Sequence, residues 1–148
     1  MPTRRQLIAA LPALALLPWA GGAAARGWFA DGGLAIRGHD PVAYVTDAAP
    51  RRGLAAHALV WEGVEWRFAS AANRDAFAAD PARYAPQFGG WCAWAVAEGY
   101  LAPIDPAAWR IVEGRLYLNA NARVQRRWER DIPGFIARAQ ANWPALRP

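Results

Sequence analysis

The sequence predicts an α+β fold: one small domain with two β-hairpin–helix units and additional helices at its C-terminal end. Apolar and polar residues alternate over residues 59–68 around a Glu-Gly turn. A second hairpin is predicted over residues 109–118 around another Glu-Gly pair. Ser70 is a good helix N-cap after the first hairpin, and a second helix begins near Asn121. The 148 residues fit a single domain.

Residues 1–25 are predicted to be a twin-arginine signal peptide, and residues 26–148 to be the domain. Arg4 and Arg5 precede a modestly apolar run over residues 7–20, and three alanines at residues 23–25 supply a cleavage site. An ordinary secretory signal or an uncleaved anchor is the alternative. Export by the twin-arginine route predicts a periplasmic protein. That route carries folded proteins, often with a cofactor already inserted.

The charge and apolar pattern limit the partners. Without Arg4 and Arg5, the 17 basic residues fall to 15 against 12 acidic ones, a net charge of +3 for the mature chain. A modest charge spread along an exported chain argues against a nucleic-acid partner. No uninterrupted apolar run of about 20 residues occurs, so no membrane span is expected in the mature protein. The single cysteine excludes an internal disulfide.

In the first half, residues 42–45 are predicted to form a short strand, because β-branched and aromatic residues follow an Asp-Pro turn signal. Residues 46–56 are expected to be an exposed loop. In the hairpin over residues 59–68, one face is apolar and buried and the other is exposed to solvent. A helix over residues 71–79 stops at an Asp-Pro step, and residues 82–87 form a turn with Tyr84 inward.

In the second half, residues 94–96 are predicted to be a strand, and residues 103–109 a loop with one helical turn. The helix from Asn121 runs to residue 130, and residues 131–134 break it because they contain a proline. A terminal helix covers residues 135–141. The two hairpin–helix units align at an offset of 51, which indicates either an internal pseudo-repeat or a chance match between similar units.

Several segments resemble the YHS domain: residues 38–44, 66–77 and 80–84. Residues 89–93 and 125–134 resemble more narrowly the exported bacterial branch, the YHS domain-containing (seleno)protein family. The resemblance implies a small YHS-like α+β domain, related to cysteine-rich metal-binding modules. Its motif residues here are Asp40, Pro41, Tyr44, Phe68, Ser70, Asn73, Phe77, Tyr84, Gly89 and Gly90.

The metal cysteines of those relatives are absent from this chain. The matching positions are Ala43, Ala69 and Asn73, so metal binding is not inherited through them. In the selenoprotein branch the reactive atom falls at the position of Cys92. The resemblance therefore implies that thiol chemistry is retained at Cys92 with a weaker nucleophile than selenium.

Cys92 follows Gly89 and Gly90 on a tight turn and stands between two tryptophans. It is either a redox or metal-ligating thiolate or a buried apolar residue that is inert. His39 can donate to the Asp40 carboxylate and offer its other nitrogen to a metal, or the pair can serve turn geometry alone. The cofactor is unknown; a transition metal at Cys92, His39 and Asp40 is one hypothesis.

The first functional hypothesis is an exported metal-binding, small-ligand-binding or thiol-redox module centred on Cys92. The alternative is a non-catalytic module that docks another envelope protein through exposed aromatics. Eight tryptophans remain in the mature chain, and they form either core or a groove. No serine–histidine–aspartate set, phosphate loop or carboxylate pair is visible, so a hydrolase is not predicted. A single-cysteine peroxide- or thiol-reducing enzyme is the third possibility.

Overall fold

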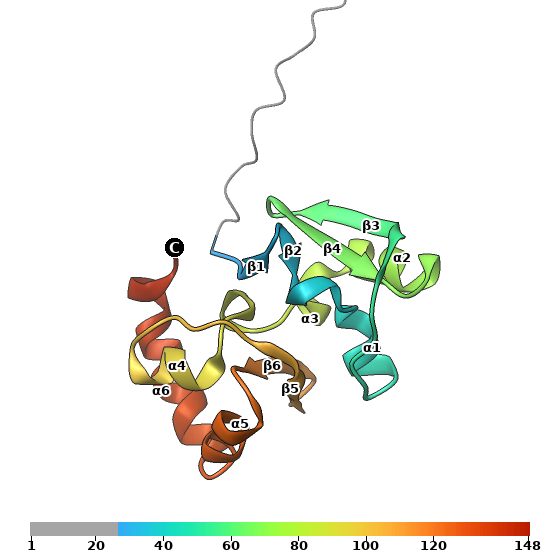
Figure 1. The fold of residues 1–148 in the computed structure, drawn as a ribbon. Helices are drawn as coiled ribbons and strands as arrows, with labels where there is room; N and C mark the ends of the chain where they lie inside the picture. The colour runs from blue at the N-terminus through green and yellow to red at the C-terminus, as the bar shows by residue number, and fades with distance from the viewer. Residues whose placement is uncertain (1–26) are drawn as a thin grey trace, which may run out of the picture.

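The computed structural model describes residues 27–148, and in these residues the chain has the predicted α+β fold with two small sheets (Figure 1). The predicted signal peptide, including Arg4 and Arg5, lies outside the described residues. None of the helices within residues 27–148 has both the length and the apolar character to cross a bilayer.

The first half forms a four-stranded sheet with its helices. The strand order is β1-β2-β4-β3, with β2 parallel to β4 and the other neighbours antiparallel. Its elements are β1 (Ala30–Asp31), β2 (Leu34–Ala35), the 3₁₀ turn η1 (Ile36–Gly38), α1 (Pro41–Thr46), β3 (Leu54–Trp61), β4 (Val64–Phe68), α2 (Ala71–Ala79) and α3 (Pro81–Tyr84).

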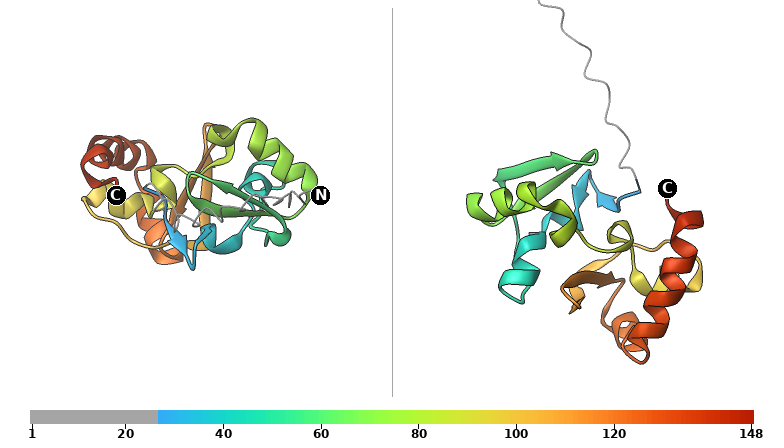
Figure 2. Two further views of the ribbon diagram at one scale, coloured as in Figure 1. Left: turned by 90° about the horizontal axis from the view of Figure 1, so that it is seen from above. Right: turned by 180° about the vertical axis from the view of Figure 1, so that it is seen from behind.

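The second half forms a two-stranded antiparallel sheet with three helices, of which the last, α6, is the longest of the described chain. Figure 2 shows the two halves side by side, with the last helix along the outer side of the second. The elements of the second half are the 3₁₀ turn η2 (Phe88–Gly90), α4 (Ala93–Glu98), β5 (Asp105–Val112), β6 (Arg115–Asn119), α5 (Ala122–Trp128) and α6 (Ile132–Leu146).

The two halves repeat the same local structure. Both strands of the second hairpin begin and end 51 residues after those of the first. The irregularity in register falls at equivalent places, between Leu54 and Ala58 and between Asp105 and Trp109. The match continues upstream at an offset of 52, where η1 and α1 correspond to η2 and α4. Matching register along whole hairpins favours the pseudo-repeat over a chance similarity of short segments.

One continuous core joins the halves. Trp66, Phe68 and Phe77 of the first half share an apolar cluster with Leu116 and Leu118 of the second. Each of these five side chains is at most 1 % exposed. Because the halves share this cluster, they form one domain rather than two independent units.

Residues 42–45 are not a strand, and that prediction was wrong. They lie in α1, where Pro41 occupies the first turn and has no N–H to leave unpaired. The Asp40 carboxylate accepts from the N–H groups of Val42 at 2.8 Å and Ala43 at 3.3 Å, which caps the helix. The Asp-Pro step therefore begins a helix instead of forming a turn, and this cap overrides the strand propensity of the residues that follow.

Residues 94–96, also predicted as a strand, lie in α4. Cys92 is the N-cap residue, and Gly99 ends the helix with a left-handed φ of 93°. Asn142 on α6 donates to the carbonyl oxygens of Val96 and Ala97 at 3.0 and 3.1 Å. The neighbouring helix thus secures carbonyl groups that a short isolated helix would leave unpaired.

The predicted loop over residues 103–109 is wrong from Asp105 onward, where β5 begins. Pro106 is tolerated because β5 is an edge strand, and its carbonyl oxygen accepts from the Tyr44 hydroxyl at 2.7 Å. The loop predicted over residues 46–56 is also too long, because β3 already begins at Leu54.

The break predicted at residues 131–134 is a helix start. Asp131 caps α6 by accepting from the Gly134 N–H at 3.1 Å, and Pro133 stands in the first turn. The helix then continues past the predicted end at residue 141 and includes Pro144 near its C-terminus. The proline that was expected to stop α5 therefore begins α6.

Candidate functional site

Cys92 lies between the core and a small buried polar network. Its side chain is fully buried, and its thiol donates to Asn119 Oδ1 over 3.5 Å. The same oxygen accepts from the Trp94 N–H at 3.0 Å, while Asn119 Nδ2 donates to Gln125 Oε1 at 2.6 Å. Gln125 in turn donates to the carbonyl oxygen of Trp109 at 3.3 Å. The network ties the start of α4 to β6, α5 and β5.

The surroundings of Cys92 act on its acidity in two opposing directions. Burial raises the pKa of the Cys92 thiol, because a thiolate would lose its hydration. Backbone N–H groups of Ala95, Ala120 and Trp94 oppose this effect and lower the pKa by a smaller amount. The thiol is therefore protonated in the resting protein at neutral pH.

Asp40 occupies the equivalent place in the first half. Its carboxylate is fully buried and, besides the two N–H groups of α1, accepts from the Ala69 N–H and from Asn73 Nδ2, both at 2.8 Å. Hydrogen bonds to several N–H groups satisfy a buried carboxylate without a metal or a cationic partner. We call these four donors the Asp40 cradle.

The donors around Cys92 match the Asp40 cradle position by position. Trp94 and Ala95 follow Val42 and Ala43 at the offset of 52, and Ala120 follows Ala69 at the offset of 51. The N-cap residues also share a backbone conformation, with φ and ψ of −78° and 113° at Asp40 and −57° and 117° at Cys92. The fold therefore places Asp40 and Cys92 at equivalent N-cap positions. The Trp94 N–H, which corresponds to the Val42 N–H, donates to Asn119 Oδ1 instead of to the N-cap side chain.

His39 does not form a metal site with Asp40 and Cys92. The hydrogen bonds to the Asp40 carboxylate come from the cradle, and the buried Nδ1 of His39 has no partner. Burial lowers the pKa of His39, which favours the neutral ring. Within residues 27–148 no group of three or more histidine, cysteine, aspartate or glutamate residues is arranged to hold a metal ion. The set Cys92, His39 and Asp40 is thus not assembled.

The other motif residues cap a helix, pack in the core or allow a tight turn. Ser70 caps α2 by accepting from the Asn73 N–H at 3.1 Å, and Tyr44, Phe68, Phe77 and Tyr84 are buried. Gly89 and Gly90 have positive φ values of 61° and 76°, and a side chain at Gly89 would overlap the carbonyl group of Gly27.

Ala43, Ala69 and Asn73, the positions where the resemblance placed metal cysteines, lie together in space. All three donate to the single carboxylate of Asp40.

Two residues of the Cys92 network were missed from the sequence. Asn119 and Gln125 are buried polar residues, 0 % and 8 % exposed. Asn119 ends the strand equivalent to β4, where the first half has the apolar Phe68, and this polar residue at a core position was the available signal. Gln125 had no signal, because a glutamine on an Arg-rich helix usually faces solvent.

Many of the described tryptophans pack in clusters. Trp28, Trp61, Trp66 and Phe77 meet in tilted or edge-to-face contacts with ring centroids 5.0–5.6 Å apart. Trp94 packs on Tyr100 and beneath the guanidinium of Arg127. Trp28 and Trp143 also line a surface hollow of about 200 Å³ together with Phe88. Among the aromatic residues of the described part of the chain, only Tyr100 is exposed, at 47 %.

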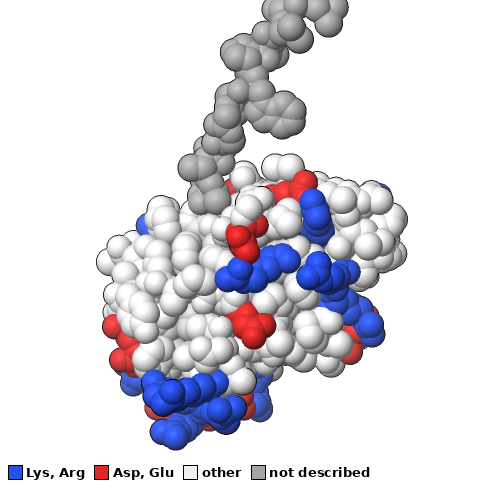
Figure 3. Space-filling view, in the orientation of Figure 1, with Lys and Arg blue, Asp and Glu red and all other residues white. Residues whose placement is uncertain are grey.

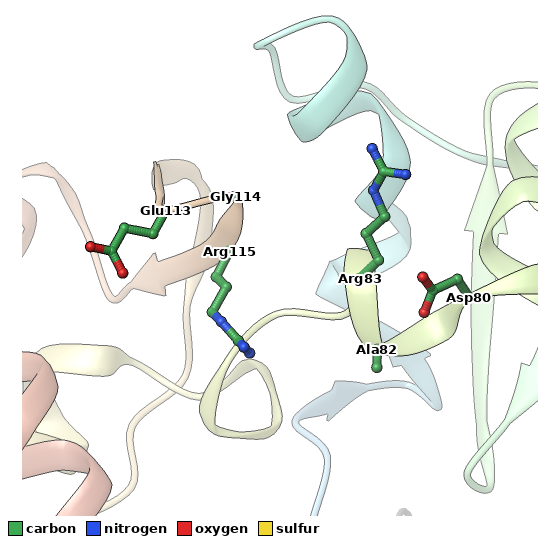
Figure 4. Close-up of a pocket in the computed structure, with 6 residues that line it drawn as sticks. All are labelled: Asp80, Ala82, Arg83, Glu113, Gly114 and Arg115. Atoms are coloured by element: carbon green, nitrogen blue, oxygen red, sulfur yellow. The ribbon is translucent and has the colours of Figure 1, made fainter.

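A shallow surface hollow of about 320 Å³ lies between α3 and the turn of the second hairpin (Figure 4). Asp80, Ala82, Arg83, Glu113, Gly114 and Arg115 line it, and none of them is a predicted site residue. The side chains of Arg83 and Glu113 extend away from Arg115 rather than toward a common point. This hollow therefore offers no convergent set of groups for a ligand.

Charged side chains are interspersed over the surface. Figure 3 shows arginines and acidic residues mixed on one face, with a basic group at the end that carries α5. Arg126, Arg127 and Arg130 are exposed, as expected for a solvated face. Comparisons of the chain with family models, curated proteins and solved structures found no match.

Proposed function

We propose that the chain is an exported, periplasmic YHS-type domain that functions as a thiol-redox module through Cys92. The observation that carries this proposal is the place of Cys92 at the N-cap of α4, which is equivalent to the place of Asp40 at the N-cap of α1. Its thiol also donates to Asn119 Oδ1 in a buried polar network. A thiol that only filled the core would have no need of polar partners.

The surroundings of Cys92 favour redox chemistry over metal binding. Backbone N–H groups lower the pKa of the thiol, an effect that favours a negative charge on the sulfur over a bound cation. A metal also needs additional acceptor ligands, and the nearest side-chain oxygen, on Asn119, already accepts from Cys92 and Trp94. The same donors stabilise the anions formed when a thiol is oxidised. Metal binding at Cys92 is thus less well supported for this chain than thiol chemistry.

The proposed reaction is oxidation of Cys92 by a peroxide. The thiol loses its proton, and the sulfur attacks one peroxide oxygen while the O–O bond breaks. The product is a sulfenic acid on Cys92, and the leaving hydroxide takes up the proton released by the thiol to form water. With one cysteine in the chain, an external thiol must reduce the sulfenic acid back, in two steps with release of water and then of a disulfide.

The experiment uses the exported chain, purified from the periplasm and kept native. The protein is treated with hydrogen peroxide at pH 7 and pH 9, and sulfenic acid is trapped with dimedone and measured by intact mass. We expect one adduct in the native wild-type protein, formed faster at pH 9 because more thiolate is present, and none in Cys92→Ser. If Cys92 reacts with neither peroxide nor an alkylating probe until the chain is denatured, the redox proposal fails.

A further inference from the structure

A hollow of about 280 Å³ lies between the second hairpin and α6, and we call it the α6 hollow. Its apolar lining comes from Val112 of β5 and from Ile132, Pro133 and Ile136 of α6, and Tyr117 of β6 also lines it. Pockets for drug-sized ligands begin at roughly 300 Å³. The α6 hollow is therefore of a size that suits a single ring with a small substituent.

The first half fills the equivalent place with an indole ring. Val112 corresponds to Trp61 and Tyr117 to Trp66 at the offset of 51, in the same register of the two hairpins. Trp61 packs on Trp66 with ring centroids 5.6 Å apart, and its carbonyl oxygen accepts from Trp66 Nε1 at 3.1 Å. The smaller valine side chain leaves the corresponding space beside Tyr117 open.

The Tyr117 hydroxyl is a polar group without a protein partner. The residue is only 4 % exposed, and its hydroxyl forms no hydrogen bond in the described part of the chain. By contrast, the buried Tyr44 donates to the carbonyl oxygen of Pro106 at 2.7 Å. Burial raises the pKa of Tyr117, and the charges of Arg115 and Glu113 lower it and raise it, respectively. Both charged residues also line the α6 hollow, so the hydroxyl stands beside one base and one acid.

These charges favour a neutral ligand. Glu113 and Arg115 extend in different directions from the hairpin turn (Figure 4), so they do not pair with each other. Arg115 would attract an anion that Glu113 repels, and the reverse holds for a cation. A ligand hydroxyl both donates and accepts, so it matches the Tyr117 hydroxyl in either direction.

We propose that the α6 hollow binds a small neutral molecule that has one apolar ring and one hydroxyl group. The ring packs against Val112 and Ile136, and the hydroxyl forms a hydrogen bond with Tyr117. A ligand hydroxyl satisfies a mostly buried polar group that the protein itself leaves unpaired. The proposal does not depend on the chemistry of Cys92.

The first experiment titrates the purified exported chain with benzyl alcohol and follows the backbone amides by two-dimensional NMR. Benzoate and benzylamine have the same ring but carry a negative and a positive charge. We expect saturable shifts of amides around the α6 hollow, with a dissociation constant of roughly 0.1–10 mM for benzyl alcohol, as its small size implies. Both charged analogues should bind at least about fivefold more weakly. Absence of saturation with benzyl alcohol up to about 50 mM, or equal affinity for either charged analogue, would overturn the proposal.

The second experiment locates the site with variants, and toluene serves as the ligand without a hydroxyl. We expect Tyr117→Phe to weaken binding of benzyl alcohol at least about fivefold and binding of toluene less than about twofold. Val112→Trp introduces into the α6 hollow the ring that Trp61 has in the first half, and should abolish binding of both. Val60→Trp makes the same change at a position of β3 that is 70 % exposed, and should leave both affinities unchanged.

Thermal unfolding of each variant checks that it is folded. Tyr117→Phe should unfold within about 2 °C of the wild type, because its hydroxyl has no protein partner to lose. If Val112→Trp does not fold, Tyr117→Phe decides the test. Equal binding of benzyl alcohol by Tyr117→Phe and the wild type, or undiminished binding by a folded Val112→Trp, would refute the site.

Discussion

Removing the Asp40 carboxylate is expected to destabilise the domain more than any other single change of a polar side chain in the first half. In Asp40→Ala, the N–H groups of Val42 and Ala43 lose their acceptor in a buried place, and the Ala69 N–H and Asn73 Nδ2 lose it in a partly buried one. Loss of an N-cap costs about 0.5–2 kcal/mol, and each buried donor left unpaired costs about 1–3 kcal/mol. Partial relaxation and overlap between these terms reduce their sum.

We therefore expect Asp40→Ala to lower the free energy of unfolding by about 3–6 kcal/mol. This is a large part of the roughly 5–15 kcal/mol that a domain has in total. Asp40→Asn keeps one oxygen for the helix but turns an amide donor toward Ala69 and Asn73, so we expect a loss of about 2–4 kcal/mol.

Equilibrium urea unfolding followed by tryptophan fluorescence measures both losses. Asp47→Asn is the control, because Asp47 is exposed and pairs with Arg51 at the surface. We expect it to change the free energy of unfolding by less than about 1 kcal/mol. If Asp40→Ala loses no more than Asp47→Asn, the Asp40 cradle does not hold the first half together as argued.

Three further predictions concern the pH dependence, the glycine turn and the helix caps. Since burial raises the pKa of Cys92, wild-type stability should fall relative to Cys92→Ser as pH rises above about 8.5; equal curves in urea unfolding between pH 7 and 10 would contradict this. Gly89→Ala should destabilise the domain by at least about 2 kcal/mol, because the new methyl group overlaps a backbone carbonyl. Gly114→Ala, at a similar φ but in open space, should cost about 1 kcal/mol in thermal unfolding, and equal losses would refute the overlap. Ser70→Ala and Asn121→Ala should each cost about 1 kcal/mol in the same assay, since both side chains cap equivalent helices; a loss in only one would count against their equivalence.

Local signals were enough for the hairpins and for α2. The alternation around each Glu-Gly turn predicted β4, β6 and the adjoining ends of β3 and β5, because side-chain period is a local property of a strand. Ser70 and the following residues predicted α2 with its observed bounds. The wrong predictions concern elements in which a proline or a capping residue is compatible with two different structures. Pro41 and Pro133 begin helices, and Pro106 lies in an edge strand, and neither outcome is decided by neighbouring residues alone.

The sequence singled out the residues of the candidate site but did not predict their surroundings. Cys92 was singled out as the one cysteine on a glycine turn, and its burial was left open. Asn119 and Gln125 became part of the site only through contacts between β6, α5 and α4. Asp40 was expected to be a possible ligand, yet its carboxylate is occupied by donors up to 33 residues away in the sequence.

The sequence by itself determined the α+β class and the two hairpin–helix units, because these depend on period, turn and cap signals within a few residues. Only the tertiary structure decided the surroundings of Asp40 and Cys92. The physical reason is that their remaining partners come from other elements, Ala69 and Asn73 for the carboxylate and Asn119 for the thiol. Only the folded chain brings those groups together.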